Sequence, residues 1–214
     1  MAAAQFAAPY PVTIDVEPAT GERNRMTIAF RMILGIPHAL LIGGIGLVFT
    51  LGSASSNYGG ILALGALGAL ASVCALISWF AIMFKDEHPE GLRDLGLFYL
   101  RWRTRGLAYL ALFRDEYPPF GDGDYPASIT VNLAEGRGDK KSVGLRIFYL
   151  IPHIIILWVL SIAWMVTSII AWFSLLIGGT YPESLYNFGI GVMRWSLRVE
   201  AYGLLLVDEF PPFS

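Results

Sequence analysis

The chain contains the same ordered set of short sequence blocks twice. Four blocks in the same order indicate an internal duplication, so we expect a fold built from two copies of one unit. Two blocks recur at an offset of 115 residues and two at an offset of 93. They are YPVTIDV at 10–16 and YPASITV at 125–131, Arg31 to Pro37-His38 and Arg146 to Pro152-His153, Arg-Trp-x-x-Arg at 101–105 and 194–198, and DE(Y/F)PPF at 115–120 and 208–213.

Long uncharged runs fill the space between these blocks. Only 15% of the 214 residues are charged, against about 25% in a typical soluble domain. Residues 32–51, 61–84 and 147–177 carry no formal charge, and about 20 apolar residues are enough to cross a bilayer as a helix. The composition therefore predicts an all-α integral membrane protein.

The two copies differ in their apolar parts. Copy one is 22 residues longer there and contains a polar break, GSASSNYGG, at 52–60. We expect two full spans, at about 32–51 and 61–84, joined by a short turn. The run 147–177 of copy two would measure about 46 Å as a helix, too long for one upright span, and two spans need about 40 residues. This run is either one long tilted helix or a short hairpin. Because we expect a tandem repeat in which each copy contains an apolar helical hairpin, the hairpin is favoured.

The segments that flank the apolar runs show two other periodicities. Residues 12–16 and 127–131 alternate apolar and polar side chains, which predicts short β-strands. Because an isolated strand cannot satisfy its backbone, we expect the two to pair outside the membrane. Helices at about 91–113 and 184–207 place arginines on one face and tryptophan on the other, which is typical of an amphipathic helix in the membrane interface.

These boundaries divide the chain into four parts. They are an N-terminal tail at 1–9, membrane repeat one at 10–120, a linker at 121–124 and membrane repeat two at 125–214.

The amphipathic helices supply the first candidate site. Arginines beside a tryptophan suit anionic lipid headgroups or a protein partner. The candidates are Arg101, Trp102, Arg105, Arg194, Trp195 and Arg198. The acidic residues Asp115, Glu116, Asp208 and Glu209 open the two Pro-Pro-Phe segments, and we expect them to form ion pairs with these arginines.

His38 and His153 follow prolines at equivalent places in the apolar runs. Each is either a neutral structural imidazole that bonds a backbone carbonyl or a proton or ligand site. A metal centre needs three or four ligands. No His-x-x-His or Glu-x-x-His motif accompanies either histidine, so we expect no metal. The sequence holds no cofactor-binding motif. Cys74 is the only cysteine, so no intrachain disulfide can form, and the net charge of −2 argues against nucleic-acid binding.

The distribution of Lys and Arg predicts an orientation. None lies at 52–60, whereas three precede the first run and ten lie between Lys85 and Arg146. The positive-inside rule then places the N-terminus in the cytoplasm. The C-terminus lies on the same side if copy two is a hairpin, and outside if the repeat is inverted.

The combined pattern of Arg-x5-Pro-His, a span ending in Trp-Phe, Arg-Trp-x-x-Arg and Asp-Glu-(Tyr/Phe)-Pro-Pro-Phe resembles the domain of unknown function 4389 family. The resemblance covers residues 10–213 and implies a multi-pass protein of the bacterial cytoplasmic membrane with tandem copies. The longer apolar part of copy one departs from the family pattern. The family has no established activity, so the resemblance implies no reaction.

These observations favour a non-enzymatic function. We expect an accessory, scaffold or assembly subunit of a membrane complex, in contact with lipids and with protein partners or further copies of itself. One alternative is a transporter or channel with a site at the repeat interface. Another is a protein that binds lipids or shapes the membrane.

Overall fold

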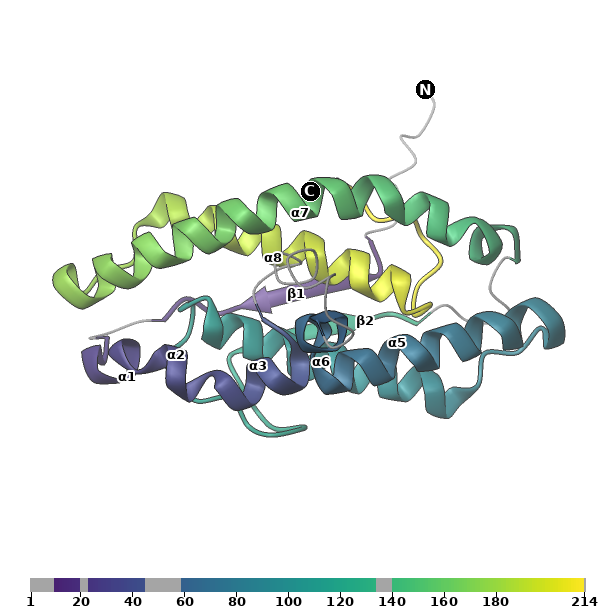
Figure 1. Cartoon of the computed structure of the whole chain (residues 1–214), viewed down its shortest axis with the longest axis horizontal. Coiled ribbons are helices and arrows are strands. Elements are labelled where there is room, and N and C mark those ends of the chain that lie inside the picture. The colour runs from purple at the N-terminus through teal and green to yellow at the C-terminus, as the bar shows by residue number, and fades with distance from the viewer. Residues whose placement is uncertain (1–9, 20–22, 45–58, 134–139, 214) are drawn as a thin grey trace, which may run out of the picture.

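The computed structural model describes residues 10–19, 23–44, 59–133 and 140–213. Helices dominate, with one pair of strands, and the order of elements in Figure 1 repeats a strand, a long helical segment and a return helix. Copy one holds β1 (Val12–Val16), α1 (Arg25–Ala29), α2 (Arg31–Leu34), α3 (Ile36–Ile42), α5 (Gly59–Lys85) and α6 (Glu90–Leu110). Copy two holds β2 (Ala127–Val131), α7 (Lys140–Gly178) and α8 (Glu183–Gly203).

The expected strand pair is confirmed, and its register shows how the copies are related. β1 and β2 are antiparallel, and Ile14 pairs with Ile129, its equivalent in the other copy. Val12 pairs with Val131, the equivalent of Val16, and Val16 pairs with Ala127, the equivalent of Val12. A local two-fold axis through the Ile14–Ile129 pair produces this register, so the two copies face each other as the subunits of a symmetric dimer would.

The apolar run of copy two is one helix. α7 continues for 39 residues with Pro152 inside it, a length of about 58 Å. The long-helix alternative is therefore right, and the hairpin expected in copy two is wrong.

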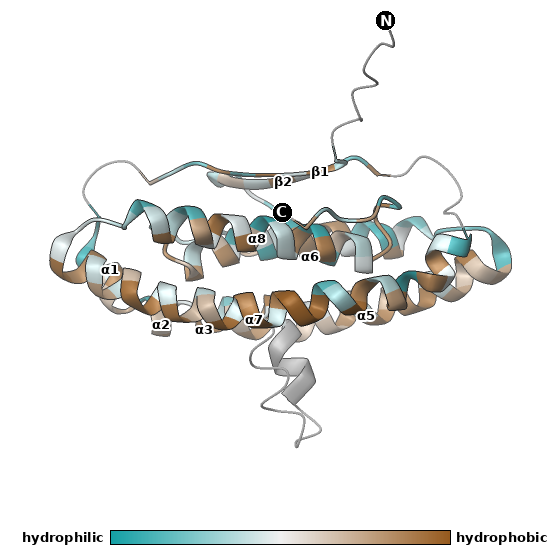
Figure 2. Cartoon of the chain, turned by 90° about the horizontal axis from the view of Figure 1, so that it is seen from above, coloured by the Kyte–Doolittle hydropathy of each residue, from teal (hydrophilic) through white to brown (hydrophobic). Residues whose placement is uncertain are grey.

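Copy one follows the same path in pieces. Figures 1 and 2 show α1, α2, α3 and α5 end to end, alongside α7. The expected span at 32–51 is represented in the described residues by α2 and α3, which ends at Ile42; the residues from 45 to 51 and most of the expected turn lie outside the described part. The span at 61–84 falls within α5.

Two glycines mark where the helical path of copy one is interrupted. Gly43 follows α3 with φ of 79°, and Gly65 has φ of 72° inside α5. A Cβ on Gly65 would lie 2.3 Å from the Gly43 nitrogen, so the two backbones touch. Both glycines correspond to Trp158 of the continuous α7, Gly43 by the offset of 115 and Gly65 by that of 93. α3 thus ends, and the helix after Gly65 begins, at a single point of one helical path, and α3 and residues 66–85 are not the two antiparallel spans we expected.

The return helices are confirmed near their expected bounds, but they pack between two other layers, with only part of each helix exposed. α6 and α8 form a middle layer between the long helices and the strand pair (Figure 2). Their buried residues, including Leu100, Leu107, Met193 and Leu197, make the main core together with Val12, Ile14 and Ile129 of the strands. Two residues after the end of each helix, an equivalent leucine, Leu112 or Leu205, has a positive φ.

The helices of the two long helical segments form the opposite surface, which we call the outer face. They are α1, α2, α3 and α5 in copy one and α7 in copy two. Figure 2 shows hydrophobic residues concentrated in this layer. Large exposed apolar side chains include Met32, Ile33, Leu40, Val73, Ile77, Phe80, Phe84, Ile147, Phe148, Ile151, Ile155, Val159, Val166, Ile169, Ile170, Phe173 and Ile177. Gly65–Lys85 and Lys140–Gly178 are long and apolar enough to cross a membrane by length and composition.

Candidate functional site

A buried arginine ties the long helix of each copy to the end of its return helix. The Arg146 guanidinium donates to the carbonyls of Tyr202 (3.0 Å) and Val207 (3.1 Å) and to Oδ1 of Asp208 (2.9 Å). It also lies 4.3 Å from the centroid of the Tyr202 ring. Arg146 therefore supplies a charged donor to two carbonyls at and just beyond the end of α8, and the Tyr202 carbonyl also accepts from the backbone N–H of Leu205. We call this arrangement the arginine anchor.

The anchor is repeated in copy one. Arg31 donates to the carbonyls of Tyr109 (3.1 Å) and Arg114 (2.7 Å) and to Asp115 (2.8 Å). Asp115 has a second partner, Arg23, at 2.6 Å. These contacts use the first residue of the Arg-x5-Pro-His block, whose role the sequence reasoning missed although its recurrence was visible.

The two histidines sit in matching aromatic cages. The indole N–H of Trp102 donates to Nδ1 of His38, and that of Trp195 to Nδ1 of His153, both at 3.1 Å. The imidazole of His38 stacks on Phe120 and that of His153 on Phe213, with centroids 4.6 and 4.3 Å apart. Because Nδ1 accepts a hydrogen bond, each ring is the neutral tautomer protonated at Nε2. Both histidines are fully buried, in a structural setting that joins the long helix, the return helix and the Pro-Pro-Phe segment.

The acidic residues find different partners from those we expected. Asp115 and Asp208 pair with the anchor arginines rather than with the Arg-Trp-x-x-Arg stripe. Glu116 pairs with Arg114 at 2.6 Å, and this hydrogen-bonded contact holds the pKa of the Glu116 carboxyl below its ordinary value. The backbone carbonyl of Glu209 accepts a hydrogen bond from the Tyr10 hydroxyl at 3.3 Å.

The arginine stripe is also split among several settings. Arg101 is exposed and makes no ion pair within the described ranges. Arg105 donates to the Gly121 carbonyl and lies 3.5 Å from Asp122 in the linker. Arg194 is half-buried, and Arg198 lies 5.6 Å from the centroid of the Tyr10 ring. Trp102 and Trp195 are buried in the histidine cages instead of facing lipid.

Each copy also holds the other through equivalent contacts. The indole of Trp79 donates to the Val143 carbonyl at 2.9 Å, and its counterpart Trp172 donates to the Ile28 carbonyl at 2.8 Å. In both cases the end of one long helix meets the start of the other. The Tyr125 hydroxyl donates to the Glu116 carbonyl, as Tyr10 does to Glu209.

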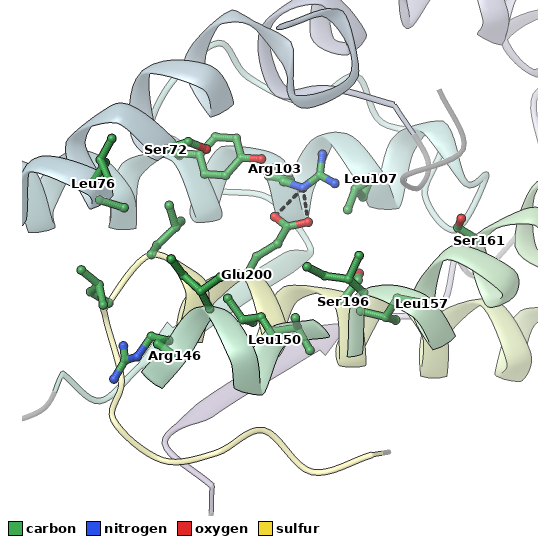
Figure 3. A pocket seen from close by; sticks show the side chains of 18 of the residues that line it. Ser72, Leu76, Arg103, Leu107, Arg146, Leu150, Leu157, Ser161, Ser196 and Glu200 are labelled. Carbon is green, nitrogen blue, oxygen red and sulfur yellow. Dashed lines mark hydrogen bonds and ion pairs between the residues drawn. The ribbon is translucent and has the colours of Figure 1, made fainter. Parts of the chain in front are cut away.

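A cavity of about 490 Å³ lies between the copies. α5 and α7 form its walls, and α6 and α8 form its floor (Figure 3). The walls are mostly apolar, and Leu76, Ile147 and Ile154 belong both to the cavity and to the exposed apolar surface. Its volume falls within the range of about 300–1,000 Å³ that is typical of small-molecule pockets.

One ion pair crosses the floor of the cavity. Nε of Arg103 lies 2.6 Å from a carboxylate oxygen of Glu200 and 2.8 Å from the other, as the dashed lines of Figure 3 show. Nη1 of Arg103 also donates to the Ile42 carbonyl, at the end of α3. Arg103 is only 6% exposed, so its charge is neutralised inside the protein.

This ion pair breaks the symmetry of the repeat. Ser196 stands in copy two where copy one has Arg103, and Leu107 stands in copy one where copy two has Glu200. All four residues line the cavity. The sequence reasoning missed this pair, although two opposite charges at positions that break a duplication were a visible signal. No cluster of three or more potential metal-binding side chains occurs among the described residues.

Comparison with known proteins identifies a family but no activity. The family model described as "Domain of unknown function (DUF4389)" matches residues 60–121 and 140–214, one segment in each copy. The first segment starts at Gly60, the last residue of the polar break. No curated protein matches the chain, and no solved structure does.

Proposed function

This chain belongs to the DUF4389 family, and we propose that it is a non-enzymatic bacterial membrane protein that lies in the plane of the cytoplasmic membrane. It enters the bilayer through the outer face of its long helices, and it serves there as a lipid-contacting accessory or scaffold protein. The observation that carries the proposal is the apolar outer face, whose exposed charges, among the described residues, lie at its ends.

The charge pattern of the long helices supports insertion. α7 carries no formal charge beyond Arg146, and α5 carries none before Lys85. Arg146 is buried in its anchor and directed at α8. The exposed cations of these helices lie at the ends of the layer: Lys140 and Lys141 at the start of α7, Lys85 at the end of α5 and Arg25 on α1. Soluble monomers rarely expose an apolar surface of this extent, which is typical of a membrane contact.

The packing of the layers favours helices parallel to the membrane over upright spans. The strands, α6 and α8 run beside the long helices along their length (Figures 1 and 2). Upright long helices would carry the strand edges and Arg101 into the hydrocarbon, where unpaired backbone groups and charges are costly. α7, at about 58 Å, is also far longer than the hydrocarbon core of about 30 Å. Lying flat, the layer can insert to a depth of about 5–10 Å.

The two ends of the described chain support the same arrangement. The Tyr10 hydroxyl donates to the Glu209 carbonyl, so the first described residue, which leads into β1, lies beside the last described segment. A flat orientation keeps both ends on one side of the membrane, and the lysine and arginine distribution favours the cytoplasmic side.

Depth measurements along α7 test this proposal. In a Cys74→Ala background, single cysteines at Phe148, Ile155, Val166 and Phe173 carry a spin label, and the protein is reconstituted into phospholipid nanodiscs. The flat orientation predicts similar, shallow depths at all four sites, from their relative accessibility to oxygen and to a water-soluble nickel chelate. Thr130, exposed on β2, is the matched control and should remain in water. Depths that rise to a maximum at the middle of α7 and fall again would establish an upright span and reject the proposal.

The accessory role has a separate test. Arg101 is exposed and lacks an ion-pair partner within the described ranges, and it lies on a helix outside the lipid-facing layer, where a partner could reach it. Affinity purification from native membranes in a mild detergent should recover a specific protein partner, and Arg101→Ala should reduce its yield. A chain that migrates alone under these conditions would remove the accessory role without affecting the membrane orientation.

A further inference from the structure

We propose that the cavity between the two copies holds the hydrocarbon chain of a membrane lipid whose polar end is uncharged. A lipid of the diacylglycerol type fits this description. The inference rests on the proposed function, because the bilayer would supply the ligand through the outer face.

The position of the cavity makes a lipid the natural occupant. α6 and α8 close the floor, so the side opposite the floor lies between α5 and α7 on the outer face. Leu76, Ile147 and Ile154 are 56%, 63% and 43% exposed while lining the cavity. An acyl chain in the membrane could therefore enter without crossing water, and it would exchange one apolar environment for another.

The walls suit a hydrocarbon chain rather than a polar solute. Leu150, Leu157 and Trp164 of α7 face Leu76 and Trp79 of α5 across the cavity.

Three serines also line the cavity, and each already donates a hydrogen bond to a carbonyl of its own helix. The pairs are Ser72 with Gly68, Ser161 with Trp158 and Ser196 with Met193. Their hydroxyl protons are therefore occupied, and the walls offer mainly apolar contact.

The floor determines which polar end can bind. Arg103 and Glu200 neutralise each other at 2.6 Å. An anionic headgroup would compete with Glu200 for Arg103 and leave a carboxylate without its partner, and a cationic headgroup would leave Arg103 in the same state. A hydroxyl group can accept from the guanidinium and donate to the carboxylate or the serine oxygens, and an ester carbonyl can accept from the guanidinium, while the ion pair remains intact. The neutral pair thus selects against charged lipids.

Photocrosslinking in nanodiscs tests the proposal. The probe is diacylglycerol with a diazirine on one acyl chain, present at low mole fraction in phosphatidylcholine nanodiscs that contain the purified full chain. We expect saturable crosslinks that map by mass spectrometry to α5 and α7 residues of the cavity wall. Unlabelled diacylglycerol should compete, whereas phosphatidic acid and a fatty acid should not.

Two variants from opposite walls fill the cavity. Leu150→Trp and Ala75→Phe should each lower saturable crosslinking by about tenfold, which corresponds to about 1.4 kcal/mol of binding free energy. Leu145→Trp is the matched control, because Leu145 is exposed on the same helix but does not line the cavity; it should bind as the unchanged protein does. Circular dichroism identifies any variant that fails to fold, and the other filling variant then decides the question.

The outcomes separate this inference from the proposed function. Crosslinking that is not saturable, or that persists in both folded filling variants, indicates bulk lipid at the outer face and overturns the cavity site while leaving the membrane orientation intact. Competition by phosphatidic acid as strong as that by diacylglycerol would overturn the selection for an uncharged polar end. Upright depths along α7 would reject the flat orientation, whatever the crosslinking shows.

Discussion

The two copies of the repeat agree at the ends of their helices and differ in the middle. The arginine anchor, the histidine cage and the tryptophan contact between copies each occur twice, with equivalent partners. The long helix, in contrast, is continuous in copy two and interrupted at Gly43 and Gly65 in copy one. The repeated residues are those that fix where one element meets another. The middle of a long helix tolerates an insertion because its two ends are held independently.

A second difference lies between the copies rather than within them. Arg103 and Glu200 pair across the local two-fold axis, whereas their counterparts Ser196 and Leu107 carry no charge. Two identical units would place the same residue type at both positions. Duplication followed by divergence therefore allowed one neutral, asymmetric ion pair at the centre of a symmetric interface.

The largest expected effect tests whether the two anchors are equivalent. Arg146→Ala should lower the free energy of unfolding by about 3–5 kcal/mol, because it leaves Asp208 without its ion-pair partner. Arg31→Ala should cost less, because Asp115 keeps Arg23 at 2.6 Å. Denaturant unfolding in detergent micelles, followed by circular dichroism, measures both values. Equal losses would show that Arg23 does not compensate.

The next effect concerns the asymmetric ion pair. Arg103→Ser should destabilise the protein by about 1.5–3 kcal/mol, because Glu200 and the Ile42 carbonyl each lose a charged donor. In the double variant Arg103→Ser/Glu200→Leu, each position carries the residue of the other copy, Ser as at 196 and Leu as at 107. This variant should recover part of the lost stability, because no unpaired carboxylate remains. The same unfolding measurement tests this. A double variant less stable than Arg103→Ser would mean that Glu200 stabilises the fold through other contacts.

The histidine cages should respond alike. His38→Ala and His153→Ala each leave a buried tryptophan N–H without its acceptor, at a cost of about 1–2 kcal/mol. Combining each with the matching Trp102→Phe or Trp195→Phe removes the unpaired donor, and a double-mutant cycle gives the coupling energy. We expect the two coupling energies to agree within about 0.5 kcal/mol. A large difference would show that one cage has a further role.

The smallest effect should come from making copy one continuous. Deleting residues 44–65 and replacing Gly43 by Trp gives copy one the spacing and the residue of copy two at Trp158. The stability should change by no more than about 1 kcal/mol, since long insertions have a modest entropic effect. Helix content by circular dichroism and the unfolding midpoint measure the result. Loss of the folded state would show that the inserted residues are required for the fold.

Periodicity and repetition in the sequence predicted much of the local structure. The strand alternation at 12–16 and 127–131 gave both strands, and the arginine and tryptophan spacing gave the return helices within a few residues. The sequence could not decide between one helix and a hairpin at 147–177. An uncharged run of 31 residues is compatible with both, and the elements against which it packs lie elsewhere in the chain.

The partners of charged residues were harder to predict. Asp115 and Asp208 lie close in sequence to Arg101 and Arg105, or to Arg194 and Arg198, yet each pairs with an arginine 84 or 62 residues away. Just after α6 and α8 end, the positive φ at Leu112 and Leu205 turns the following segment back over the long helix. This reversal directs the aspartates to Arg31 and Arg146.

The sequence by itself determined that the chain is a duplication with long uncharged segments, paired strands and two amphipathic helices, because these features depend on local spacing and composition. The tertiary structure alone decided that the amphipathic helices are buried between two layers, that one helical path is interrupted at two touching glycines, and that Arg103 of one copy meets Glu200 of the other. Those features depend on how the two copies face each other across the local two-fold axis. That arrangement arises from contacts between residues far apart in the chain, which no pattern within either copy specifies.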